Sequence, residues 1–237
     1  MIQTEGVFVG GSAISAPIIG EDFNWSGGDG TYQVLDDGGG NWRIKFLSSG
    51  TFTPLKNMVI DAFLVGGGGG AGSSYCGEGG AGYTTTVRSV VLTANTAYSI
   101  VVGAAGTNGN PSSAGGETTA FTASAAGGKN TSNGTSSSKR PGGAGGSGGA
   151  GYVSPVATTT GGTDGGDGTS SATTGGKGQG TTTREFGEAD GTLYASGGGS
   201  NLTATVSNSG NGGRNGITSI APADGIVVIR QHKEVAA

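Results

Sequence analysis

Residue types that carry enzyme chemistry or staple small domains are scarce in this sequence. Its 237 residues include one cysteine, Cys76, and one histidine, His232. A single cysteine excludes an internal disulfide framework and any four-cysteine metal site. A single histidine removes most acid–base and metal chemistry. We therefore expect a protein that is not an enzyme and that holds neither a cofactor nor a metal ion.

Long apolar runs and a leader pattern are lacking as well. No run approaches the ~20 apolar residues of a membrane span, and residues 1–6 show no basic segment leading into an apolar one. We expect no membrane insertion, and synthesis in a host cytoplasm without a signal peptide. The net charge is -4, and the scattered Lys and Arg residues form no basic stripe, so we expect no nucleic-acid partner.

Helical periodicity is also missing, whereas strand patterns recur. No segment has a convincing 3.6-residue period, so we expect almost no α-helix. Residues 31–35 and 42–47 flank a turn rich in Asp and Gly, a pattern that predicts a β-hairpin. The sequence thus predicts an all-β fold with an antiparallel β-sandwich framework. Further strands are expected near 58–65, 83–92, 98–102, 117–123 and 225–231.

Glycine is what the chain has in excess, at 55 residues, roughly three times average usage. Gly66–Gly72 follows directly on the apolar run 58–65, and 142–151 repeats the pattern Gly-Gly-X. A period of three residues matches the polyproline II helix. Glycine-rich excursions between strands therefore predict a packed polyglycine II helix bundle. A disordered low-complexity insert is the alternative, and the strand at 225–231, which has to return to the sheet, favours the ordered bundle.

These patterns divide the chain in two. We expect residues 1–57 to form a β-rich N-terminal attachment or framework segment. Residues 58–237 are expected to form the glycine-rich domain of strands and polyglycine II helices.

Several blocks resemble a known family. The strand-to-glycine junction 60–72, the blocks 81–86 and 98–103, the pair 184–188 with 191–195, and the closing 224–230 resemble the glycine-rich domain of phage and prophage tail proteins. The architecture is similar to the polyglycine II tail-fibre adhesins of T-even-type phages. The resemblance implies a virion or surface binding module, and it covers about 58–231.

Two glycine-rich motifs point to other chemistry but lack its structural context. Gly67-x-Gly69-x-x-Gly72 follows a strand, as in the dinucleotide-binding fingerprint, but no helix pattern comes after it to hold phosphate. Asp164 and Asp167 invite comparison with calcium sites, but their spacing misses the calcium-binding nonapeptide repeat. We interpret the first as scaffold and the second as solvated turn residues.

Binding residues are expected in the segments that interrupt the glycine-rich tracts, because functional residues favour loops on a rigid scaffold. A polar, cationic segment from 129 to 140 suits anionic glycans, and two tyrosines could stack on sugar faces. The alternative for Tyr152 is a structural role at the edge of the bundle. Phe186, Leu193 and Tyr194 are expected to pack in the core. The receptor-binding candidates are Tyr75, Lys129, Asn130, Asn133, Lys139, Arg140, Tyr152 and Val153.

Three functions stay open on this sequence. The first is a phage or prophage tail adhesin of the virion that recognises a glycan or an outer-surface protein on a bacterium and contacts other tail proteins. The second is a structural tail-tip or spacer protein without its own ligand. The third is an ice- or matrix-binding protein, which the clustered rather than periodic threonines at 158–160 and 181–183 disfavour.

Overall fold

The structure is a computed structural model, and almost all of the regular structure in it is β-strand. Its one helical element in the described part is a 3₁₀ turn, η2 (Glu185–Gly187). In that part, no helix is long and apolar enough to cross a membrane. The described residues are 8–9, 12–13, 22–38, 40–135, 140–151, 179, 183–199, 202, 204–214 and 220–231.

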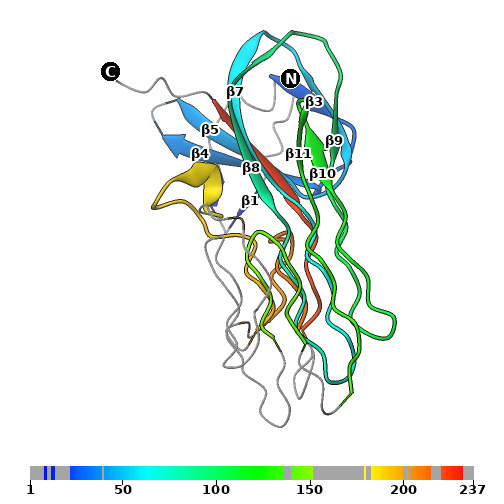
Figure 1. The fold of residues 1–237 in the computed structure, drawn as a ribbon. Helices are drawn as coiled ribbons and strands as arrows, with labels where there is room; N and C mark the ends of the chain where they lie inside the picture. The colour runs from blue at the N-terminus through cyan, green and yellow to red at the C-terminus, as the bar shows by residue number, and fades with distance from the viewer. Residues whose placement is uncertain are drawn as a thin grey trace.

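Two antiparallel sheets of five strands face each other at one end of the molecule (Figure 1). The first sheet has the order β4-β5-β12-β7-β8 and the second β11-β10-β9-β6-β3. Strands β1 and β2 form a separate short pair. The strands are β1 (Phe8–Val9), β2 (Ser12–Ala13), β3 (Phe23–Trp25), β4 (Tyr32–Gly38), β5 (Asn41–Phe46), β6 (Gly50–Pro54), β7 (Met58–Val65), β8 (Thr84–Leu92), β9 (Tyr98–Val101), β10 (Thr118–Ala120), β11 (Ala123–Ala125) and β12 (Ile226–Gln231).

Strand β7 is buried on both faces from residue 60 to residue 65, which explains why this run is apolar apart from Asp61. Ile60, Ala62 and Leu64 point into the main core between the sheets. Phe63 and Val65 point to the opposite side, into a second core. β12, which lies between β5 and β7, alternates in the same way. A strand covered on both faces reads as continuously hydrophobic rather than alternating.

The predicted all-β sandwich is confirmed, and the hairpin expected from 31–35 and 42–47 is β4 with β5. One strand prediction is wrong in detail. The run 117–123 forms two short strands, β10 and β11, joined by Phe121 and Thr122. Both joining residues have positive φ, as a tight hairpin turn requires. The Phe121 ring stacks edge-on against Phe52 in the core, and that packing outweighs its poor turn propensity.

Strands from both sides of the predicted boundary at residue 57 pair in both sheets. β5 pairs with β12, and β6 pairs with β9. The boundary itself falls in the turn between β6 and β7. An attachment role for residues 1–57 stays a prediction.

Below the sheets the chain runs in long, nearly parallel excursions without strand pairing (Figure 1). The first excursion, 66–71, donates its backbone N–H groups with a period of three. Gly66 and Gly69 donate to Tyr83 and Gly80, whereas Gly67 and Gly70 donate to Gly116 and Ser113. Three residues per turn is the geometry of the polyproline II-type helix. The predicted polyglycine II bundle is thus present in the described tracts.

Excursion 66–71 lies at the centre of this bundle. Its N–H groups bond to segments 77–83 and 113–116 and to Ala223. Its carbonyl groups accept from Gly106 and Gly109, from Gly128 and Thr131, and from Gly213. Excursion 77–83 repeats the pattern with pairs three residues apart: Glu78 and Ala81 donate to Ala150 and Ser147. Hydrogen bonds that a lone polyproline II helix would give to water are here made to neighbouring tracts.

The close approach of these tracts explains the glycine. A Cβ added at any residue of Gly66–Gly70 would come within 3.0 Å of a backbone carbonyl oxygen of another tract. All five residues are buried. Tracts at the edge of the bundle tolerate side chains on their outer side, so 103–109 has glycine at every third position while Ala104 and Thr107 are exposed.

Candidate functional site

The turns that join the tracts gather at the end of the bundle remote from the sheets. Excursion 66–71 leaves the end of β7, and 77–83 leads into β8, so the turn between them lies at the far end. Excursions 103–109 and 126–131 leave β9 and β11 in the same way. We call the described residues of these turns the tip: 72–77, 108–113, 129–135 and 140–142 (Figure 1).

Asn133 joins two turns of the tip. Its Oδ1 accepts from the backbone N–H of Ser73 at 2.7 Å, and its Nδ2 donates to Ser73 Oγ at 3.0 Å. The backbone N–H of Gly134 donates to the carbonyl of Ser74 at 3.1 Å. These bonds fix the turn that carries Tyr75 against segment 131–134.

Asn130 joins a third turn to the same segment. Its Nδ2 donates to the carbonyl oxygen of Ser112 at 2.9 Å and to Ser112 Oγ at 3.0 Å. Ser112 Oγ donates in turn to the carbonyl of Thr131. The buried Thr131 hydroxyl accepts from the N–H of Gly72 at 3.1 Å and donates to the carbonyl of Gly77. The tip is therefore a cross-linked platform rather than a set of independent loops.

The receptor-binding candidates divide by how their side chains are used. The side-chain amides of Asn130 and Asn133 form hydrogen bonds between turns. Tyr75 is 46% exposed, at the apex of its turn with φ 48°. Lys129 is exposed and Arg140 is half-buried. Lys139, Tyr152 and Val153 lie outside the described residues.

Sequence reasoning missed the structural partners Ser73, Ser112 and Thr131. Each contacts a residue 18 to 60 positions away in the chain. Nothing in the local pattern of a Ser-rich turn indicates such a distant partner. These contacts could have been predicted only from the period of the glycine tracts, because that period sets how far along the bundle each turn lies.

The cations of the described sandwich are paired with carboxylates, whereas the two described cations of the tip have no carboxylate partner among the described residues. Arg43, Lys45, Lys56, Arg88 and Arg230 each lie within 4.0 Å of a carboxylate. Lys129 and Arg140 form no ion pair within the described part of the chain. Arg140 Nε is shielded from solvent and has no hydrogen-bond partner there.

A second cluster of charges lies on the outer face of the first sheet, where segment 183–195 covers β5, β7 and β12. Asp61 is fully buried. Its Oδ2 accepts from Arg88 at 3.1 Å and from Arg230 at 3.2 Å, and its Oδ1 accepts from the N–H of Ser89 at 3.1 Å. Arg230 also bonds to Glu188 at 2.8 Å and lies 4.2 Å from the Phe186 ring centroid.

Glu185 is the other buried carboxylate of this cluster. It pairs with Arg43 at 2.5 Å and with Lys45 at 3.5 Å. Lys45 donates to the Tyr194 hydroxyl at 3.0 Å. Burial raises the pKa of the Tyr194 hydroxyl, an effect that the hydrogen bond from Lys45 opposes. A hydrogen bond to Asp37 raises the pKa of Arg43 above its ordinary value, burial lowers it in part, and Glu185 raises it further.

This outer-face cluster fastens segment 183–195 to the sheet. Phe186 and Tyr194 are buried against Phe63, and their ring centroids lie 6.1 and 5.6 Å, respectively, from that of Phe63. The core packing predicted for both is confirmed, whereas Leu193 is only half-buried. The negative charges of the buried carboxylates are compensated by the arginines paired with them, and aromatic rings cover these ion pairs. In the described residues, no three His, Cys, Asp or Glu side chains are grouped to hold a metal ion.

Comparison with protein families agrees with the high glycine content of the chain. A family model described as a glycine-rich domain matches residues 47–230. The chain belongs to this glycine-rich domain family. The matched range runs from just before β6 almost to the end of β12, so it contains tracts 66–71 and 77–83 and the described tip. No curated protein matches the sequence.

Proposed function

We propose that this glycine-rich domain is a non-enzymatic receptor-binding module of a phage or prophage tail, exposed on the virion, whose tip recognises the surface of a bacterium. One observation carries the proposal. Three turns from different parts of the chain are gathered at the far end of the bundle and locked together by Asn130 and Asn133. Rigid display of loops at the end of a scaffold is the usual arrangement of binding residues.

The bundle supplies what such a module needs. Its tracts hold one another by backbone hydrogen bonds, so the ends from which the turns leave are held in place independently of the exposed side chains that the turns carry. A pre-organised surface loses less conformational entropy when it binds. Resemblance to tail-fibre adhesins supports the phage context, and other tail proteins are the partners expected at the sandwich.

A structural spacer is the second candidate. The observation that favours it is the use of the Asn130 and Asn133 side chains for contacts within the tip, where they stabilise the bundle. In that case the tip is a closed end, and the molecule only extends a tail component from its neighbours.

Binding to whole cells separates the two candidates. Fluorescently labelled protein is incubated with a broad panel of bacterial strains, and binding is measured by flow cytometry. A tip variant combines Tyr75→Ser with Lys129→Gln. A matched variant combines Val91→Ser with Lys56→Gln, which removes one exposed apolar side chain and one exposed cation from the sandwich.

If the protein is an adhesin, at least one strain should bind the wild type and the matched sandwich variant equally well. The same strain should bind the tip variant less. Equal binding by both variants would refute a tip receptor site. No binding to any strain of a broad panel would favour the spacer.

A further inference from the structure

We propose that the ligand of the tip is an acidic polysaccharide of the bacterial surface, a polymer bearing carboxylate or phosphate groups. This inference rests on the proposed function and narrows it from a receptor of either kind to one ligand chemistry. It is carried by the distribution of charge and of apolar side chains over the described surface.

Charge is the first observation. The chain as a whole is acidic, with 16 Asp and Glu against 12 Lys and Arg. The tip reverses this sign, since its described residues include Lys129 and Arg140 and no Asp or Glu. Neither cation is paired with a carboxylate in the described part, unlike Lys56 with Asp22 at 2.6 Å on the sandwich. A positively charged end attracts an anionic polymer and orients the rest of the molecule away from it.

The state of Arg140 adds a second observation. Its Nε is shielded from solvent without an acceptor among the described residues. Buried polar groups are normally hydrogen-bonded. A guanidinium without a carboxylate partner in the described part of the chain can pair with carboxylate or phosphate oxygens of a ligand, the acceptors that suit its geometry.

The rest of the tip favours a polysaccharide over a protein. Apart from the two cations, its described side chains are mostly hydroxyls and amides, with Cys76, two exposed prolines (Pro111 and Pro141), one partly exposed aromatic ring, Tyr75, and no large aliphatic residue. Tyrosine offers an apolar ring face with a polar end. Protein interfaces need a desolvated, mostly apolar centre. Such residues are exposed in other parts of the molecule: Leu55, Val59, Val91, Val101 and Val206.

The test measures binding of the full chain to polymers of defined charge by biolayer interferometry. The probes are polygalacturonate, which has a carboxylate on each sugar, lipoteichoic acid, which has phosphates, and neutral dextran. We expect binding to at least one acidic probe and not to dextran, with affinity that falls as salt is raised. Which acidic probe binds distinguishes carboxylate from phosphate recognition.

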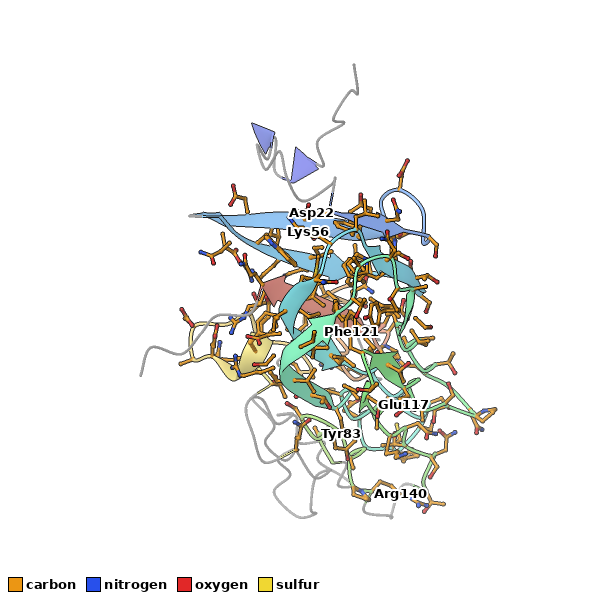
Figure 2. The ribbon with its side chains drawn as sticks, turned by 90° about the horizontal axis from the view of Figure 1, so that it is seen from above. Asp22, Lys56, Tyr83, Glu117, Phe121 and Arg140 are labelled. Carbon is orange, nitrogen blue, oxygen red and sulfur yellow. The ribbon has the colours of Figure 1, made fainter. Side chains whose placement is uncertain are left out.

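Single charge removals locate the site. Lys129→Gln is expected to weaken binding of the acidic probe about two- to fivefold, the range of an exposed ion pair. Arg140→Gln is expected to weaken it at least as much. Lys56→Gln is the matched control and should leave binding unchanged. Figure 2 shows Lys56 beside Asp22, on the opposite side of the molecule from Arg140 in that view.

Several outcomes would overturn the proposal. Equal weakening by Lys56→Gln and Lys129→Gln would mean that binding is not at the tip. Binding to cells that survives excess acidic probe but is lost after protease treatment of the cells would assign an outer-surface protein as receptor. The adhesin function would then stand and the polysaccharide would not. Binding to neither cells nor acidic probes would remove both.

Discussion

The sandwich and the glycine bundle are built by opposite uses of the side chain. In the sandwich, aromatic and aliphatic side chains fill the space between the sheets, and Phe46 and Phe52 are fully buried. In the bundle, the absence of side chains lets backbones approach until Gly66–Gly70 bond directly to neighbouring tracts. Apolar burial stabilises the first region, and shared backbone hydrogen bonds stabilise the second.

Because of this difference, different kinds of substitution should destabilise the two regions. A core of side chains tolerates some change of shape but loses stability when volume is removed. A core of backbone has no volume to lose, and it fails when volume is added. Substitutions of opposite kinds therefore separate the two regions.

Phe52→Ala should have the largest effect. Phe52 packs against Phe23, Phe46 and Phe121 with ring centroids 5.2, 5.6 and 6.3 Å away. Truncating such a side chain costs about 3–5 kcal/mol of unfolding free energy, because the cavity cannot fully collapse. Denaturant unfolding followed by tryptophan fluorescence measures it. A loss below about 1 kcal/mol would show that the sheets are not held by this aromatic cluster.

Gly68→Ala should rank next, at about 3 kcal/mol, although it adds only one carbon. The new Cβ would collide with the backbone carbonyl of Asn211, which cannot rotate away as a side chain does. The control is Ala104→Ser, which also adds one heavy atom but at an exposed position of an outer tract. The control should unfold within about 0.5 kcal/mol of the wild type. Equal stabilities for the two variants would contradict close packing around tract 66–71.

Tyr194→Phe should cost about 1 kcal/mol at pH 7, since it removes the hydrogen bond from Lys45. It should also change the alkaline limb of the stability curve. The pKa of Tyr194 is raised in the folded state, mainly by burial. Its contribution is then complete below the unfolded pKa of about 10 and is lost as pH rises through the folded value.

Above about pH 10, the wild type should therefore lose stability more steeply than Tyr194→Phe. Urea unfolding at a series of pH values up to 11.5 checks this. Parallel curves for the two proteins would mean that the hydroxyl does not titrate from a buried position.

Lys129→Gln should have the smallest effect on stability, within about 0.5 kcal/mol. Its side chain is exposed and makes no ion pair in the described part. Binding of the acidic probe should nevertheless fall. This combination of effects would distinguish the tip from the sandwich core and from the glycine bundle, where substitutions lower stability. A stability loss as large as that of Gly68→Ala would make Lys129 part of the scaffold.

Much of the framework could be predicted from the sequence, because strand patterns are local. The runs at 58–65 and 225–231 predict β7 and β12 without knowledge of their partners. The Gly-Gly-X period likewise predicts helices of three residues per turn. The turn at Phe121 and Thr122 could not be predicted, since buried packing places these residues at positive φ against their ordinary preference.

The tip was predictable only in part. Loops that interrupt glycine tracts predict where binding residues lie, and the candidates Tyr75, Lys129 and Arg140 are among the described tip residues; their role in binding stays a prediction. The sequence could not show that the amides of Asn130 and Asn133 are used between turns, because their partners are set by the level at which separate tracts end. Neither could it show that Glu185 and Asp61 are buried together with arginines on the sheet.

The glycine tracts form an ordered bundle held by backbone hydrogen bonds. Amide hydrogen exchange, followed residue by residue by NMR, tests it most directly. We expect the amides of Gly66–Gly70 and Gly79–Gly82 to exchange as slowly as those of β7 and β12, because each tract is enclosed by others. Exchange of these glycines at the rate of an unstructured chain, with protection confined to the strands, would contradict it.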